Sequence, residues 1–153
     1  MTTKTIHVSC AIIENRGTVL CVRRSSTMAM PLKWEFPGGK LLDDESPAAC
    51  LVREVREELG VIVSIRQPLT PVTHHYPVFT ITLYPFICSI TEGSVTLHEH
   101  AALVWLPPSE LSVLDWADAD RLVIEEYLKA GRGREDEGTG NRQEDERPLK
   151  ERT

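Results

Sequence analysis

Residues 38–61 read GGKLLDDESPAACLVREVREELGV, and this stretch carries the strongest local signals in the chain. Ser46 is a residue type that caps helix starts, and Pro47 suits the first helical position, where its missing N–H costs nothing. Gly60 suits the left-handed residue that ends a helix. These signals predict a helix over residues 47–59.

The predicted helix has an apolar side and an acidic side. At about 100° per residue, one narrow stripe is apolar and is expected to face the core: Ala48, Val52, Val55 and Leu59. On the far side, Glu54, Glu57 and Glu58 fall within an arc of about 100°. Carboxylates at this spacing repel one another and lie near the unfavourable end of the helix dipole. Two interpretations remain: a solvated face beside Arg53 and Arg56, or a site for a hard cation such as Mg²⁺.

The spacing of the whole segment distinguishes them. Gly39 is followed after five residues by Glu45, and after seven more by REVREELGV at residues 53–61. This resembles the Nudix box, Gly-x5-Glu-x7-Arg-Glu-U-x-Glu-Glu-x-Gly-U with U a bulky aliphatic residue, at every specified position. The resemblance implies an α/β/α sandwich with a mixed β-sheet, in which the box forms a loop–helix–loop. It also implies hydrolysis of a nucleoside diphosphate linked to another group, with Mg²⁺ or Mn²⁺ as cofactor.

The resemblance assigns roles to residues of this chain. The implied metal ligands are Gly38, through its carbonyl, with Glu54, Glu57, Glu58 and Glu99. Arg53 and Glu45 resemble the family's internal ion pair, although Glu45 alone could be a favourable acid near a helix start. Metal ions would neutralise the polyphosphate and activate water, and Glu54 or Glu99 would remove the proton.

Glu99 lies in the sequence His98-Glu99-His100, just before a predicted strand. MutT-type members of the family place a further acidic residue there, and the alternative is a loop acid between two polar histidines. The two histidines could also form a transition-metal pair, but neither a thiolate nor a third ligand supports that interpretation.

The substrate class rests on residues 34–40, WEFPGGK. They resemble MutT-type enzymes and CTP pyrophosphohydrolases, which convert (deoxy)nucleoside triphosphates, 8-oxo-dGTP among them, to the monophosphate and pyrophosphate. The resemblance gives three candidate substrate-binding residues: Arg24, Phe36 and Asp120. Two more follow from their side chains: Lys40 could reach a phosphate, and Tyr76, with an apolar body and a polar tip, could form the pocket wall opposite Phe36. Their alternatives are a core position for Phe36, an exposed loop position for Lys40 and sheet packing for Tyr76. For Asp120 the alternative is a helix cap, and an Asp there resembles the CTP-active relatives more than the 8-oxoguanine enzymes.

The remaining sequence supports an α/β fold. Alternating or apolar segments predict strands over residues 5–12, 19–22, 61–65, 72–76, 79–90 and 101–106. A turn is predicted at residues 15–17, and a second helix over about 118–129. Strands with a helix between two groups of them favour a mixed sheet. We expect a Nudix domain over residues 1–130 and a disordered charged tail over 131–153, which has almost no apolar residue to bury.

The composition of the chain excludes some classes of binding partner. Seventeen basic against 23 acidic residues give a net charge of −6, which disfavours a polymeric nucleic-acid binder. No apolar run approaches the roughly 20 residues of a membrane span, and no signal peptide precedes the first predicted strand. Four cysteines without a CxxC pair suggest reduced thiols and a cytoplasmic protein. We expect a monomer or a homodimer.

Two rival functions stay open. One is a Nudix hydrolase of ADP-ribose, a dinucleoside polyphosphate or another nucleotide conjugate. The other is a non-catalytic nucleotide-binding module, which is disfavoured because such a module has no need of three mutually repelling glutamates.

Overall fold

The computed structural model describes residues 4–137, and the side chains of residues 4–130. Its strands are β1 (Lys4–Asn15), β2 (Thr18–Arg23), β3 (Trp34–Glu35), β4 (Gly38–Lys40), β5 (Ile62–Pro68), β6 (Val72–His75), β7 (Phe79–Glu92) and β8 (Ala102–Leu106). Its helices are α1 (Pro47–Leu59), the 3-10 helix η1 (Pro108–Val113) and α2 (Asp118–Glu137).

The strands form one mixed sheet in the order β3-β2-β1-β7-β5. β1 and β7 run parallel, in register from Lys4 opposite Phe79 to Ile13 opposite Cys88, and the other named pairings are antiparallel. β4 pairs with β1, β6 with β7 and β8 with β2. The predicted α/β class with a mixed sheet is therefore confirmed.

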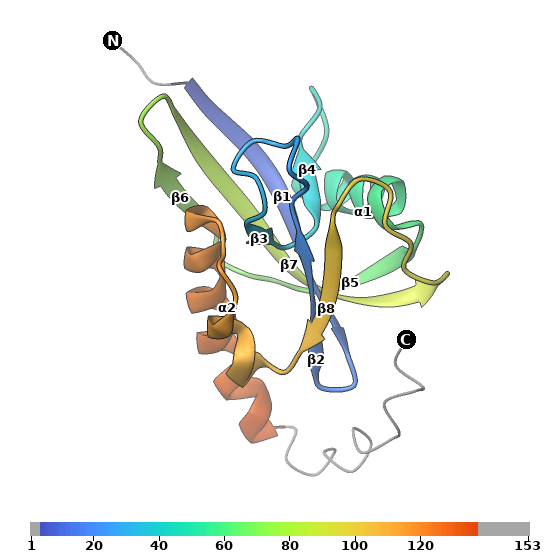
Figure 1. Cartoon of the computed structure of the whole chain (residues 1–153). Coiled ribbons are helices and arrows are strands. Elements are labelled where there is room, and N and C mark those ends of the chain that lie inside the picture. The colour runs from blue at the N-terminus through green and yellow to red at the C-terminus, as the bar shows by residue number, and fades with distance from the viewer. Residues whose placement is uncertain (1–3, 138–153) are drawn as a thin grey trace.

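The predicted strand over residues 5–12 is present as part of the central strand β1, whose residues 9–13 are buried on both faces of the sheet. Cys10 and Ile12 belong to one apolar cluster, which includes residues of α2, whereas Ala11 and Ile13 belong to a second cluster with α1. Figure 1 shows the two helices on opposite sides of the sheet. Each fully buried aliphatic side chain contributes about 1.5–3 kcal/mol by leaving water. The result is a three-layer α/β/α sandwich.

Helix α1 has the predicted bounds and both predicted ends. The Ser46 side chain accepts a hydrogen bond from the Ala49 N–H at 3.1 Å, and Gly60 is left-handed with φ 72°. The buried stripe differs from the predicted one: its members are Cys50, Leu51, Val55 and Leu59. Ala48 and Val52 are only half-buried, because the helix turns Leu51 toward the sheet.

Several elements depart from the sequence prediction. β3, β4 and η1 were not predicted, because segments this short show no periodicity. α2 continues to Glu137, past the predicted domain boundary at residue 130, since each added residue of a formed helix gains a hydrogen bond. The predicted disordered tail otherwise falls on residues 138–153, outside the described residues. No described helix is long and apolar enough to cross a membrane.

Candidate active site

Arg53 on α1 holds the loop that precedes the helix. Its Nε and Nη2 donate to the two carboxylate oxygens of Glu45 at 2.7 and 3.0 Å, and Nη2 also donates to the Lys40 carbonyl at 3.3 Å. The Leu42 N–H donates to Glu45 at 2.9 Å. The Arg53 hydrogen bonds, followed by that of Leu42, lower the pKa of Glu45 to about 2. The predicted ion pair is thus present and fixes the loop against α1.

The same guanidinium brings two of the predicted metal ligands together. Arg53 Nη1 donates to Glu54 Oε2 at 2.8 Å and to Glu57 Oε1 at 3.2 Å. Glu54 is half-buried and Glu57 is exposed, so neither is sealed in apolar packing. The two carboxylates therefore lie on one side of α1, as the helical spacing predicts.

Two glycines allow the loop backbone to approach closely. A Cβ on Gly39 would lie 2.2 Å from the Glu54 carboxyl carbon, and one on Gly38 would lie 1.9 Å from the Ser9 carbonyl oxygen. The Gly38 N–H donates to Glu58 Oε1 at 3.3 Å. The backbone of this loop is therefore in contact with the acidic side of α1. A side chain at position 38 would collide with the β1 backbone, whereas one at position 39 would displace the flexible end of Glu54.

Glu58 is half-buried, like Glu54, whereas Glu57 is exposed. Burial raises its pKa to about 7, the positive charge of His100 opposes the rise, and the negative charges of Glu35 and Glu54 add to it. Glu58 therefore lies in a crowded acidic environment, in which a bound cation would favour the ionised form.

Glu35, which was not predicted as a site residue, bonds to Arg24 and to His100 beside this acidic region. Arg24 Nη1 donates to one oxygen of Glu35 at 2.7 Å, and His100 Nε2 bonds the other at 2.8 Å. The predicted substrate contact Arg24 is thus paired with a carboxylate. The signal was available, since Glu35 stands inside the WEFPGGK segment, but nothing in the sequence shows which groups it meets.

His100 is enclosed between these charges. Burial alone would lower its pKa, but the hydrogen bond to Glu35 and the charges of Glu35 and Glu58 outweigh it and raise the pKa. Its side chain is 2% exposed, and its Nδ1 is a buried nitrogen without a hydrogen-bond partner among the described residues.

Three candidate base-pocket residues meet on the α2 side of the sheet. Asp120 is buried, and its Oδ2 accepts a hydrogen bond from the Phe36 N–H at 3.0 Å. Burial, and then the charge of Glu35, raise the pKa of Asp120 to about 8. The Tyr76 hydroxyl accepts from the Ala119 N–H at 3.2 Å, beside Asp120.

Phe36 itself occupies a core position, the alternative stated for it. It is 2% exposed, and its ring lies 4.7 Å from that of Trp116, centroid to centroid. Lys40 is exposed, the ordinary position for a loop lysine. Phe36 therefore reaches Asp120 through its backbone, while Lys40 lies on the helix side with Arg53.

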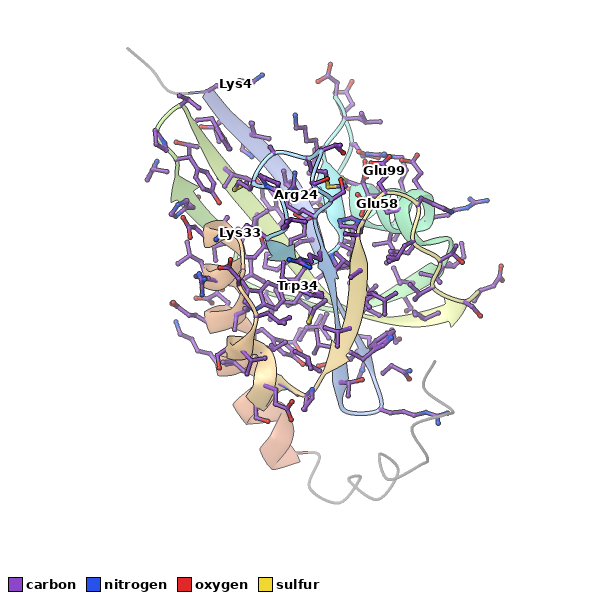
Figure 2. The ribbon with its side chains drawn as sticks, viewed as in Figure 1. Lys4, Arg24, Lys33, Trp34, Glu58 and Glu99 are labelled. Carbon is purple, nitrogen blue, oxygen red and sulfur yellow. The ribbon has the colours of Figure 1, made fainter. Side chains whose placement is uncertain are left out.

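Glu99 lies on the loop before β8 and is exposed. Its carboxylate forms no hydrogen bond or ion pair with any residue the structure describes. In the view of Figure 2, Glu99, Glu58 and Arg24 lie at the same end of the sheet, where β2 ends and β8 begins.

The donor atoms present are suited to a hard divalent cation. Within the part of the chain that the structure describes, no three His, Cys, Asp or Glu side chains converge into a preformed metal site. Mg²⁺ does not require one, since it commonly binds one or two carboxylates, keeps several waters and shares substrate phosphates. The Glu54 side chain lies beside the glycine loop, and Glu58 accepts a hydrogen bond from it. Both therefore offer carboxylate oxygens where such an ion could be held.

Comparison with known protein families shows to which family the chain belongs. The NUDIX domain family matches residues 3–127, which is most of the chain. The chain belongs to the Nudix family. The predicted enzyme class, a Nudix hydrolase acting on phosphoric anhydride bonds, is confirmed with it.

Similar proteins are consistent with this membership. The chain is 35% identical over 125 residues to the CTP pyrophosphohydrolase of Escherichia coli, covering 82% of this chain and 93% of that protein. It is 35% identical over 97 residues to an 8-oxo-dGTP diphosphatase of Proteus vulgaris, covering 63% and 87%. The solution structure of the E. coli ORF135 protein superposes with a TM-score of 0.74 at 34% identity, over 86% of this chain and 94% of that one.

Proposed function

We propose that this Nudix protein hydrolyses (deoxy)nucleoside triphosphates to the monophosphate and pyrophosphate with Mg²⁺, for which Mn²⁺ can substitute. Such an activity would remove unwanted nucleotides from the pool used for DNA synthesis, as in MutT-type sanitation. The relatives named CTP pyrophosphohydrolase and 8-oxo-dGTP diphosphatase support this substrate class.

One observation carries the proposal: the backbone of residues 36–38 joins the acidic side of α1 to the buried Asp120. The Gly38 N–H donates to Glu58 at 3.3 Å and the Phe36 N–H donates to Asp120 at 3.0 Å, and the charge of Glu35, which precedes Phe36, adds to the burial that raises the pKa of both carboxyl groups. A polyphosphate at α1 and a base at Asp120 would thus belong to one molecule of nucleotide size.

At the phosphate end, Glu54, Glu57 and Glu58 would hold the cation with the Gly38 carbonyl, and Glu99 would complete the set. The cation, when bound, neutralises part of the polyphosphate charge and lowers the pKa of the attacking water. Arg53 and Glu45 keep the loop carbonyls in place against α1. Either Glu54 or Glu99 would accept the proton from water.

At the base end, Asp120 would contact the base edge. With a pKa of about 8 it is protonated near neutral pH, so it offers both an O–H donor and a carbonyl acceptor. Tyr76 would form a wall of the pocket, and the backbone of Phe36 would orient Asp120. Arg24, held by Glu35, and the exposed Lys40 would contact the rest of the nucleotide.

Two further assignments belong to the proposal. All four cysteines are free and buried, which supports a reducing compartment such as the cytoplasm. The substrate is a free nucleotide rather than a nucleic-acid strand or a membrane component, consistent with the net charge of −6.

The test is a nucleotide panel assayed with Mg²⁺. CTP, dCTP, 5-methyl-dCTP, dGTP, 8-oxo-dGTP, ADP-ribose and a dinucleoside tetraphosphate are compared by kcat/KM, and the released phosphate species is identified. We expect pyrophosphate from at least one triphosphate, at a kcat/KM about a hundredfold above that for ADP-ribose, because binding a matched base edge distinguishes substrates strongly. Preference for a conjugate, release of orthophosphate, or no turnover would refute the proposal.

A further inference from the structure

The loop between β7 and β8 carries His98, Glu99 and His100, and its two histidines bond to different parts of the site. His98 Nδ1 donates to the Glu57 carbonyl oxygen at 2.8 Å. Because a carbonyl oxygen only accepts, Nδ1 must carry the proton. His100 Nε2 donates in the other direction, to Glu35 at 2.8 Å. The two rings therefore bond to separate groups and do not form the transition-metal pair that the sequence left open.

Backbone hydrogen bonds hold both ends of the same loop. The Thr96 N–H donates to the Leu59 carbonyl at 2.9 Å, and the Ala101 N–H donates to the Arg23 carbonyl at 2.8 Å. The carbonyls of Leu59 and Glu57 belong to the last turn of α1, where they lack partners within the helix. The loop therefore closes the end of α1 on one side and joins the end of β2 on the other.

Glu99 stands between these two attachments. Its neighbours His98 and His100 are both committed to hydrogen bonds, while its own carboxylate bonds to none of the described residues and is exposed. The residue whose carbonyl His98 holds, Glu57, is itself on the acidic side of α1. The position of Glu99 relative to that side therefore depends on the His98 hydrogen bond.

We propose that His98 and His100 are positioning residues that present Glu99 to the cation held on the acidic side of α1. Fixing the loop in advance removes the entropy that ordering it would otherwise cost when the metal–nucleotide complex binds. The inference rests on the proposed function, which gives Glu99 its role as a ligand, and adds the two residues that place it.

Matched amide variants test each hydrogen bond. The Asn amide nitrogen takes the place of His Nδ1, and the Gln amide nitrogen takes the place of His Nε2. His98→Asn should therefore keep the bond and His98→Gln should lose it, while His100→Gln should keep its bond and His100→Asn should lose it. His7→Ala, which removes another exposed histidine with a side-chain hydrogen bond, is the control.

The readouts are Mn²⁺ binding to the nucleotide-free protein by electron paramagnetic resonance, and the Mg²⁺ concentration for half-maximal activity. Loss of an outer partner of a metal ligand typically costs about 10–100-fold in metal affinity. We expect His98→Gln and His100→Asn to bind Mn²⁺ about tenfold more weakly than the reciprocal variants His98→Asn and His100→Gln, which share the loss of the imidazole ring and its charge, while His7→Ala stays close to wild type. A melting temperature for each variant shows whether it is folded.

A double-mutant cycle separates positioning from a structural effect. With Glu99→Gln already in place, His98→Gln should weaken Mn²⁺ binding no further. Equal weakening in both backgrounds, or no difference between the Asn and Gln variants at either histidine, would overturn the inference while leaving the proposed function intact. Unchanged Mn²⁺ binding and turnover in Glu99→Gln alone would instead overturn the role of Glu99 in the proposed function.

Discussion

The buried Asp120 should make the stability of this protein depend on pH in a way that one substitution removes. The residue is 7% exposed, its carboxyl group receives one hydrogen bond from the Phe36 N–H, and burial, with the charge of Glu35 adding to it, raises its pKa from 3.8 to about 8. In Asp120→Asn the amide oxygen can accept the same hydrogen bond, while the group no longer ionises. The variant therefore isolates the cost of a buried charge.

The magnitude follows from linkage. Between about pH 4 and pH 8 the folded protein keeps the Asp120 proton and the unfolded chain has lost it, so raising the pH favours unfolding. One proton of difference is worth about 1.4 kcal/mol per pH unit. From pH 5 to pH 7 wild type should lose about 3 kcal/mol of unfolding free energy relative to Asp120→Asn. Above pH 8 both states are ionised, and the difference should become constant.

The measurement is urea denaturation of both proteins at pH 5, 6, 7, 8 and 9, with the difference in unfolding free energy plotted against pH. Asp118→Asn, the same chemical change at an exposed position two residues earlier, is the matched control. A difference between wild type and Asp120→Asn that stays flat from pH 5 to pH 8 would show that Asp120 ionises normally when folded. The assigned protonation state of the base pocket would then be wrong.

Three further predictions concern the glycine loop and the acidic side of α1. Glu57→Gln or Glu58→Gln should lower kcat by about a hundredfold or more with an unchanged circular dichroism spectrum, because a neutral amide is a much weaker ligand for a hard cation; near-wild-type rates in both would contradict this. Gly39→Ala meets only the flexible end of Glu54, so kcat should fall while the melting temperature barely changes. Gly38→Ala meets the β1 backbone at 1.9 Å, so its melting temperature should fall by several degrees, and an unchanged value would refute that close contact.

The sequence predicted what local interactions determine. Helix α1 matches residue for residue, because Ser46, Pro47 and Gly60 act on backbone within one turn of themselves. The long strands β1 and β7 were predicted by their alternation and length, but their parallel pairing was not, since residues more than 70 positions apart meet there. The two-residue strand β3 exists only because Trp34 and Glu35 pair with β2, so no property of those residues alone reveals it.

The site residues also fall into two groups: those that local spacing predicts and those that only the tertiary fold brings together. The Arg53–Glu45 pair follows from a spacing of eight residues around a helix start, and the shared position of Glu54 and Glu57 follows from helical periodicity. Glu35 was not predicted as a site residue, because its partner His100 is 65 positions away in the chain. Its role depends on tertiary contacts, which a single sequence does not show.

The charges at the site give a reason for a divalent cation that does not depend on the motif. Five carboxyl groups gather there: Glu35, Glu54, Glu57, Glu58 and Asp120. The arginines that pair with them, Arg24 and Arg53, are already bound to carboxylates. Burial, with the charge of Glu35 adding to it, raises the pKa of Glu58 to about 7 and that of Asp120 to about 8, so this region disfavours further negative charge. A triphosphate would add several more negative charges to the same small region, in a chain of net charge −6. Its binding without a cation should therefore be weak, because the nearby arginines are already paired, and the carboxylate oxygens present suit a hard divalent ion as the added counter-charge.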